Sequence, residues 1–129
     1  MSDRLFTPES LPAAGVGVFS LDEALPRSST LIEASAGTGK TFTLTHLAAN
    51  FIERDALPIS QLLLVTYTRA AAGELRDRLR RVLRQRAATT TDTDASTRLR
   101  IAAEEFDTAT ITTIHGFCQQ VLTTLGVNV

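Results

Sequence analysis

The feature that most constrains this chain is a glycine-rich segment, Ala34-Ser35-Ala36-Gly37-Thr38-Gly39-Lys40-Thr41, which lies between a short apolar run and an amphipathic stretch. Glycines let backbone N–H groups close around phosphate oxygens, and a helix that follows presents its positive N-terminal end to the same anion. In the pattern G-x-x-x-x-G-K-[ST], the lysine reaches the outer phosphates and the hydroxyl holds Mg²⁺, roles that fall to Lys40 and Thr41. Ala34 replaces the first glycine of that pattern. The segment therefore predicts a site for ATP and Mg²⁺; the alternative is a strand-to-helix turn without a ligand.

Strand-like and helix-like segments alternate along the chain. Short apolar or β-prone runs predict three neighbouring parallel strands, at 30–34, 61–67 and 110–113. Apolar residues at helical spacing predict helices over 40–54, 70–86, 96–106 and 114–125, with Gly126 as the end signal of the last. A threonine-rich stretch at 89–94 predicts a mobile linker. The expected fold class is α/β, with a parallel sheet flanked by helices.

Composition limits the number of domains and indicates the cellular compartment. The 129 residues suffice for one domain, and three of the four prolines fall within residues 1–29, which predict an irregular N-terminal arm before a domain over 30–129. No apolar run approaches the roughly 20 residues that cross a bilayer, so no membrane partner is expected. The segment 1–4 lacks the character of a signal peptide, and the single cysteine, Cys118, excludes an internal disulfide. These features predict a cytoplasmic protein.

Arginines are concentrated in one part of the chain. The net charge of −1 gives no support to nucleic-acid binding, but residues 69–86 contain seven arginines and only two acids. Arg76, Arg80 and Arg84 form a row at helical i, i+4 spacing, for which solvent is the expected partner.

Two further segments resemble conserved motifs of superfamily 1 (UvrD/Rep-like) DNA helicases, in which alanine is usual at the first position of the phosphate loop. Residues 65–79, VTYTRAAAGELRDRL, resemble motif Ia, and residues 113–119, TIHGFCQ, resemble motif Ib. Together with residues 33–43, these two segments are most similar in sequence to the beta-subunit family of exodeoxyribonuclease V, and the resemblance covers 31–125. It implies a RecA-like P-loop NTPase fold and the N-terminal part of motor domain 1. The motor domain would be incomplete, since the family's acidic motif would lie after Val129.

The resemblance also implies an activity, partners and site residues. The parent protein would be a subunit of an ATP-dependent DNA helicase and exonuclease, which works on single- or double-stranded DNA ends in double-strand break repair and recombination. Its partners would be the gamma and alpha subunits of exodeoxyribonuclease V. By motif match, single-stranded DNA would contact Thr66, Tyr67, Thr68 and Arg69, with Tyr67 stacking on a base, and Thr113 and His115 would grip the DNA backbone.

Other interpretations remain open at this point. Tyr67 alone is typical of a core-edge aromatic, His115 of a helix-terminal hydrogen-bonding group, and Phe117 and Cys118 of buried core residues. A small P-loop kinase would need a catalytic acid or lid, and neither is recognisable. A stand-alone module that binds nucleotide or DNA without turnover is the non-enzymatic alternative. The isolated chain is expected to bind nucleotide weakly and to hydrolyse it little, because no acidic residue follows a predicted strand.

Overall fold

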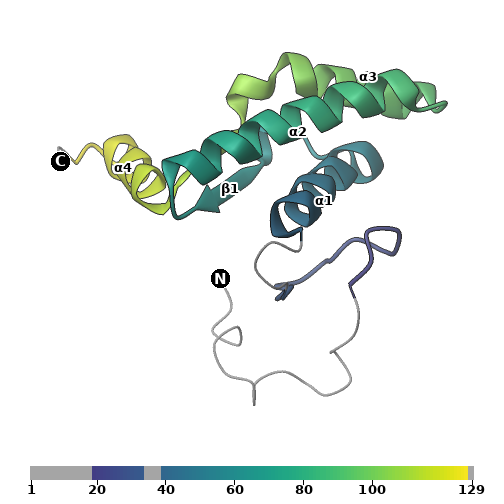
Figure 1. The fold of residues 1–129 in the computed structure, drawn as a ribbon. Helices are drawn as coiled ribbons and strands as arrows, with labels where there is room; N and C mark the ends of the chain where they lie inside the picture. The colour runs from purple at the N-terminus through teal and green to yellow at the C-terminus, as the bar shows by residue number, and fades with distance from the viewer. Residues whose placement is uncertain (1–18, 34–38, 128–129) are drawn as a thin grey trace.

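The computed structural model describes residues 19–33 and 39–127, and Figure 1 shows their arrangement. The described part of the chain contains two strands and four α-helices, together with two short 3₁₀ turns. In chain order these are α1 (Lys40–Asp55), η4 (Ile59–Gln61), β1 (Leu63–Thr66), α2 (Arg69–Thr89), α3 (Thr93–Glu104), η5 (Phe106–Thr108), β2 (Thr110–Thr113) and α4 (Ile114–Thr124). No helix of the described ranges combines the length and apolar character that a bilayer-crossing segment needs.

The two strands form a parallel pair, as the chain's alternation of strands and helices predicts. Their register places Leu64 opposite Ile111 and Thr66 opposite Thr113. Leu64 and Ile111 are both buried and face the core, whereas the side chains that flank Leu64 along β1 lie on the opposite, half-exposed face: Leu63 and Val65. One face of this small sheet is therefore covered and the other is open within the described residues.

Helices α1, α2 and α3 pack against one another, and α2 also contacts both strands. Three leucines at helical spacing along α2 are buried, Leu75, Leu79 and Leu83, while Val82 is half-buried. They join a single core cluster with Leu64 and Ile111 of the sheet. The core is thus built on the α2 side of the sheet, where apolar burial removes most water from the helix stripe.

Side-chain caps determine where the middle helices begin. Thr68 precedes α2, and its Oγ1 accepts a hydrogen bond from the backbone N–H of Ala71 at 3.1 Å. Asp92 precedes α3 and accepts from the N–H groups of Asp94 and Ala95 at 2.9 and 3.2 Å. These bonds satisfy donors that the first turn of a helix leaves free. Since α3 starts at Thr93 rather than at residue 96, the predicted linker over 89–94 is reduced to residues 90–92.

The predicted strand at 30–34 is wrong for residues 30–33, which form neither strand nor helix; Ala34 lies outside the described residues. A strand exists only through hydrogen bonds to a neighbouring strand, and the sheet of the described residues contains β1 and β2 alone. Leu31 is 40% exposed, so burial does not hold this run against the sheet either. The apolar run before the glycine loop predicts a strand from local sequence alone. Whether another strand pairs with it depends on the tertiary structure.

Helix α4 also differs from expectation. It ends near the predicted Gly126, whose φ of 78° is the left-handed conformation that glycine favours. However, α4 has no buried residue among those described; Phe117 is half-buried and the Cys118 thiol is exposed. The prediction of a buried Cys118 is therefore wrong, because helical spacing shows an apolar face without showing that another element covers it.

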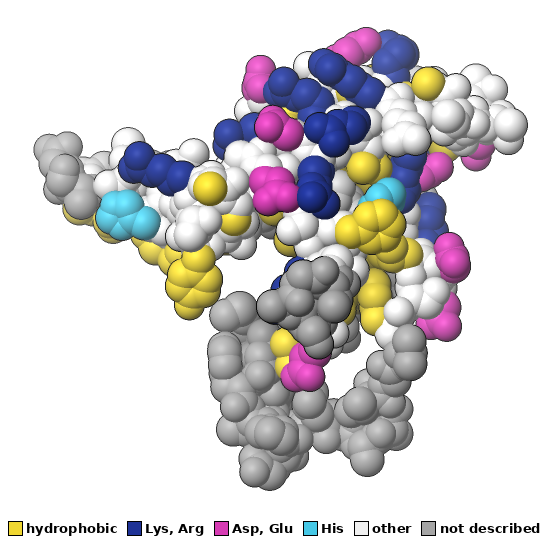
Figure 2. All heavy atoms as spheres, viewed as in Figure 1, with side chains coloured by type: hydrophobic (Ala, Val, Ile, Leu, Met, Phe, Trp, Pro, Cys, Tyr) yellow, Lys and Arg dark blue, Asp and Glu magenta, His cyan; other side chains and the backbone are white. Residues whose placement is uncertain are grey.

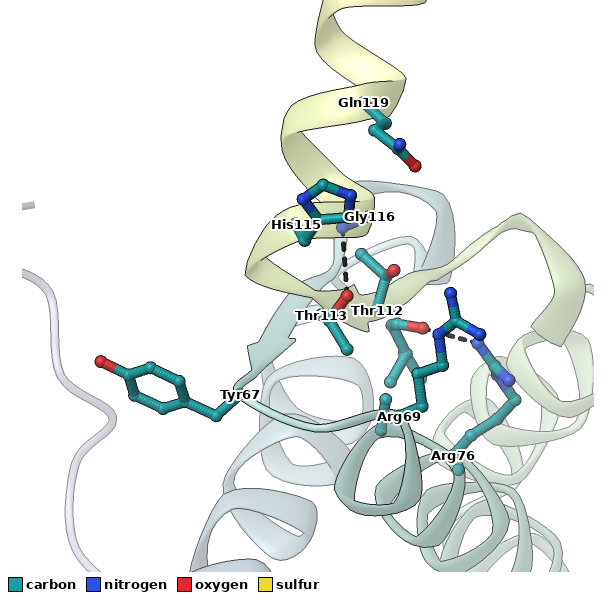
Figure 3. Close-up of a pocket in the computed structure, with 11 residues that line it drawn as sticks. Tyr67, Arg69, Arg76, Thr112, Thr113, His115, Gly116 and Gln119 are labelled. Atoms are coloured by element: carbon teal, nitrogen blue, oxygen red, sulfur yellow. Dashed lines mark hydrogen bonds between the residues drawn. The ribbon is translucent and has the colours of Figure 1, made fainter.

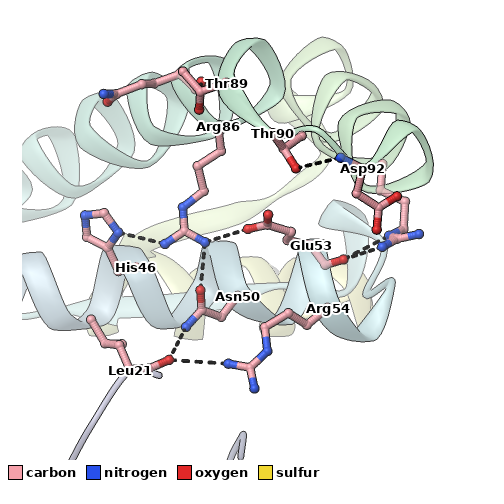
Figure 4. Close-up of polar contacts among 11 residues, drawn as sticks. Leu21, His46, Asn50, Glu53, Arg54, Arg86, Thr89, Thr90 and Asp92 are labelled. Atoms are coloured by element: carbon pink, nitrogen blue, oxygen red, sulfur yellow. Dashed lines mark hydrogen bonds and ion pairs between the residues drawn. The ribbon is translucent and has the colours of Figure 1, made fainter. Parts of the chain in front are cut away.

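A single guanidinium ties α1, α2 and the N-terminal segment together (Figure 4). Arg86, near the end of α2, donates to Asn50 Oδ1 at 2.7 Å and to Glu53 Oε2 at 2.8 Å. Its Nη2 also lies 2.8 Å from Nδ1 of His46. Asn50 in turn donates through Nδ2 to the carbonyl oxygen of Leu21 at 3.0 Å. Because the Arg86 and Glu53 side chains are 22% and 24% exposed, this ion pair is better shielded than those on the surface.

This network makes a prediction about pH. Burial, and then the charge of Arg86, lower the pKa of His46 from its ordinary value of 6.5. A neutral imidazole accepts the Arg86 N–H at Nδ1, whereas a protonated one cannot. Between the lowered pKa and 6.5 the unfolded chain binds more protons, so the free energy of unfolding should rise with pH across that window and level off above 6.5. The NMR titration of His46 and chemical unfolding at several pH values measure both effects.

Arg86→Gln should raise the pKa of His46 toward 6.5, because it removes the second of the two causes. Arg81→Gln, an exposed change on the same helix, is the matched control and should leave that pKa unchanged. A pKa of His46 at or above 6.5 in the unaltered chain would contradict the prediction.

Candidate nucleotide and nucleic-acid sites

The parallel register brings two predicted motifs to the same edge of the sheet. Thr66 ends β1 and pairs with Thr113, which ends β2. The two segments that follow these strands therefore leave the sheet side by side. Residues 66–69 lead directly into α2, and Thr113 and His115 lie at the start of α4. The predicted nucleic-acid residues from the two motifs are therefore neighbours, although more than forty residues separate them in sequence.

A hollow of about 560 Å³ lies where these segments meet, and Figure 3 shows its walls. Arg69 and Arg76 rise from α2 toward α4, which contributes His115 and Gln119, while Tyr67 projects outward at the end of β1. The hollow is lined by two arginines and a histidine and by no aspartate or glutamate. A strand-end cavity with uncompensated basic groups is suited to an anionic ligand.

Tyr67 stands free of the core. Its side chain is 91% exposed, so the alternative of a core-edge packing residue is wrong. The turn that carries it is fixed by its neighbours, because Thr66 Oγ1 donates to the Thr68 carbonyl at 3.0 Å and Thr68 caps α2. An exposed aromatic ring held on a structured turn can stack on a nucleobase at little ordering cost.

The start of α4 is capped by Thr113 and not by His115. Thr113 Oγ1 accepts the backbone N–H of Gly116 at 3.0 Å (Figure 3). His115 is exposed, so the alternative in which it serves as the helix-terminal hydrogen-bonding group is wrong. His115 lines the hollow instead, and its exposed side chain is available to a ligand.

Two lining residues, Arg76 and Gln119, were not predicted as part of a site. Arg76 donates through Nη2 to the carbonyl oxygen of Ile111 at 2.6 Å, so the expectation of solvent as its partner is wrong. That bond anchors the guanidinium beside β2 while its other N–H groups remain for a ligand. Helical spacing was the available signal, since Arg76 follows Arg69 by seven residues and Gln119 follows His115 by four.

Two helix N-termini add to the positive potential of the hollow. Helices α2 and α4, of 21 and 11 residues, both begin at this edge of the sheet. Each N-terminus carries a partial positive charge from its aligned peptide dipoles, and neither first turn contains an acid. The helix dipoles and the basic side chains therefore both favour a negatively charged ligand.

The glycine loop is described only at its end. Residues 34–38 lie outside the described residues; Gly39 has φ 94°, a left-handed conformation, and α1 begins at Lys40. Among the four α-helices of the described ranges, α1 alone has no side-chain cap, and its first turn contains no acid. Lys40 is exposed and Thr41 is half-buried at this end. The free N–H groups of α1 and the Lys40 ammonium thus fit a phosphate group.

Residues 22–129 match the family described as UvrD/REP helicase N-terminal domain. The chain belongs to this family. It is 40% identical over 119 residues to the RecBCD enzyme subunit RecB of Mycolicibacterium smegmatis, a match that covers 79% of this chain and 11% of the relative. The Mycobacterium tuberculosis RecBCD enzyme subunit RecB is 39% identical over 131 residues, with 84% and 12% covered. An ATP-dependent helicase/nuclease subunit from Alkaliphilus metalliredigens is 40% identical over 95 residues, with 74% and 8% covered.

The chain thus spans about a tenth of the length of these curated relatives. The matched region of this UvrD/REP helicase N-terminal domain contains all the helices and strands described above. The family assignment and the α/β arrangement of a small parallel sheet with helices are consistent with one another.

The close approach of α4 to β2 makes a prediction about Gly116. A Cβ added there would overlap Thr112 Oγ1 and would lie 3.2 Å from Thr113 Oγ1, which is held as the cap. Gly116→Ala should therefore lower the melting temperature and weaken binding at the hollow, because the Thr112 side chain or the start of α4 must shift. Gly73→Ala is the matched control: a Cβ there meets nothing within 4 Å, and helix propensity should stabilise α2 by up to about 1 kcal/mol. Thermal melts of both variants measure this, and a Gly116→Ala protein as stable as the unaltered chain would refute it.

Proposed function

We propose that this UvrD/REP helicase-family chain is the ATP-binding portion of an ATP-dependent DNA helicase and exonuclease subunit that works in double-strand break repair and recombination. The observation that carries the proposal is the hollow at the sheet edge, which His115 and two arginines line beside two helix N-termini, with the exposed Tyr67 projecting outward from its rim. The RecB and helicase/nuclease names of its relatives support the same activity. The proposal includes DNA ends as substrate, the gamma and alpha subunits of exodeoxyribonuclease V as partners, and a cytoplasmic location.

The hollow suits a single strand of DNA bound without regard to sequence. Tyr67 offers an aromatic face to a base, and every base has a face that can stack. Arg69 and His115, with the hydroxyls of Thr68 and Thr113 at the same edge, offer donors to the phosphates that all sequences share, while the hydroxyl of Thr66 holds the turn by donating to the Thr68 carbonyl. A motor that tracks along a strand needs this combination, since contacts to base edges would halt it at particular sequences.

The nucleotide site is proposed at 34–41, in a P-loop NTPase fold. Lys40 would contact the β- and γ-phosphates, Thr41 would hold Mg²⁺, and backbone N–H groups of the loop and of the first turn of α1 would surround the phosphates. When bound, ATP with Mg²⁺ supplies the phosphoryl transfer to water that drives such motors. Neither described strand is followed by a carboxylate that could position water, since Tyr67 and Thr68 follow β1 and Ile114 and His115 follow β2. We therefore propose that the isolated chain binds nucleotide weakly without appreciable turnover, and in that state acts as a binding module.

Isothermal calorimetry tests the nucleotide site. Lys40→Ala should remove the binding heat of Mg²⁺–ATP, because it deletes the only cation of the loop, while the exposed Arg100→Ala on α3 should retain it. Equal affinities for the unaltered and Lys40→Ala chains would exclude this site. Robust ATP hydrolysis by the purified chain would refute the second half of the proposal.

Fluorescence anisotropy with a short single-stranded oligonucleotide tests the DNA site. Tyr67→Ala should weaken binding by about 1–3 kcal/mol, the range for loss of one stacked base, and His115→Ala should flatten the salt dependence. Tyr67→Phe is the matched control, since it keeps the ring and should keep most of the affinity. Because both residues are exposed, melting temperatures should not change. Unchanged affinity in both alanine variants would remove these residues from the site.

A further inference from the structure

The arginines of α2 extend well beyond the hollow at the sheet edge. Arg69, Arg76, Arg80 and Arg84 follow one another at intervals of seven, four and four residues, which places them along one face of a helix. A second hollow of about 560 Å³ lies further along α2, lined by Arg80, Arg84 and three other residues: Asp77, Arg81 and Gln85. Figure 2 shows arginine side chains gathered over the part of the molecule where α2 runs, with some acidic side chains among them. We call Arg69, Arg76, Arg80 and Arg84, together with Arg81, which adjoins Arg80 and Arg84 at the second hollow, the α2 arginine face.

The members of this face nearest the sheet are oriented by contacts that leave most of their charge uncompensated. Arg76 donates to a backbone carbonyl, which leaves its charge uncompensated. Arg80 stacks over the Phe106 ring at 4.7 Å and lies 3.3 Å from a carboxylate oxygen of Asp107, whose side chain is 97% exposed. Arg80 therefore has side-chain partners that were not expected. An ion pair so open to water contributes little, however, and water remains the main partner of Arg80.

Arg81 and Arg84 have no carboxylate within ion-pairing distance in the described part of the chain. Other exposed arginines of α2 and α3 are matched by acids one helical turn away. Arg78 pairs with Glu74 at 2.8 Å, and Arg100 pairs with Glu104 at 3.0 Å. Uncompensated charge is therefore concentrated on one face of α2, where Asp77 is the single acid lining the second hollow.

We propose that the α2 arginine face is a second contact surface for the phosphate backbone of the same nucleic-acid strand that occupies the first hollow. This inference rests on the proposed DNA-binding function and extends its path along the helix. From Arg69 to Arg84 the helix rises about 22 Å at 1.5 Å per residue. At the 3.4 Å axial rise per phosphate of one strand in stacked, duplex-like geometry, that length spans about six phosphates. Strands longer than the first hollow should therefore gain affinity from Arg81 and Arg84, whereas shorter strands should not.

The test compares two lengths of oligothymidylate, of about four and about twelve nucleotides, within the range of known single-strand site sizes. Anisotropy titrations at several salt concentrations are made with the unaltered chain and with R81Q/R84Q. The control R78Q/R100Q removes the same charge from arginines that are already paired. Melting temperatures verify that both double variants are folded.

For the longer strand, R81Q/R84Q should reduce the slope of log K against log salt by about 1.4, or about 0.7 for each lost phosphate contact, and should lower affinity on the order of tenfold. The shorter strand should bind R81Q/R84Q and the unaltered chain equally. An equal loss in R78Q/R100Q, or an equal loss for both lengths, would overturn the inference, because either would indicate net charge alone. Competition by polyglutamate as strong as that by oligothymidylate would also overturn it.

The failure of this inference is distinguishable from failure of the proposed function. If the shorter strand binds and that binding is lost in Tyr67→Ala, the first hollow is a DNA site. An unchanged salt slope in R81Q/R84Q would then remove only the α2 arginine face. If the shorter strand does not bind the unaltered chain, both proposals fail together.

Discussion

Parallel pairing of β1 with β2 places Thr66 opposite Thr113, and the arrangement of the functional edge depends on that pairing. Since the strands run in the same direction, the two segments that follow them emerge together, and α2 and α4 both begin at this edge. Two helix N-termini, an exposed tyrosine and a histidine thereby meet although they are distant in sequence. A shift of either strand by one residue would turn its buried side chain, Leu64 or Ile111, to the open face and would separate these groups.

Helix α2 is the element that contacts most of the others: it packs on α1, on α3 and on both strands. Its leucine stripe supplies burial worth about 1.5–3 kcal/mol for each fully buried side chain, whereas exposed ion pairs contribute about 0–1 kcal/mol. Leu79 and Leu83 therefore contribute more to holding α2 in place than the exposed ion pairs of its arginines do. Arg86 is different, because its shielded bonds to α1 connect the helix that follows the glycine loop with the helix that borders the hollow.

Local patterns predicted much of the fold. The helices over 40–54 and 70–86 and the strands within 61–67 and 110–113 are confirmed within a few residues, because hydrophobic periodicity and capping side chains act over short distances. The strand at 30–33, the burial of Cys118 and solvent as the partner of Arg76 were wrong. Each of these depends on whether another element lies alongside, and periodicity within one segment does not contain that information.

For the candidate site the division is similar. The sequence by itself determined the residue types and their order: a glycine loop before α1, and two motifs whose hydroxyl, aromatic and basic side chains favour phosphates and bases. Only the tertiary structure decided that the motifs share one edge, that Thr113 rather than His115 caps α4, and that Arg76 and Gln119 join the hollow. The physical reason is that each side chain carries its own chemistry, whereas a binding surface requires several side chains to come together in space. Convergence follows from strand register and helix packing, which act between segments far apart in the chain.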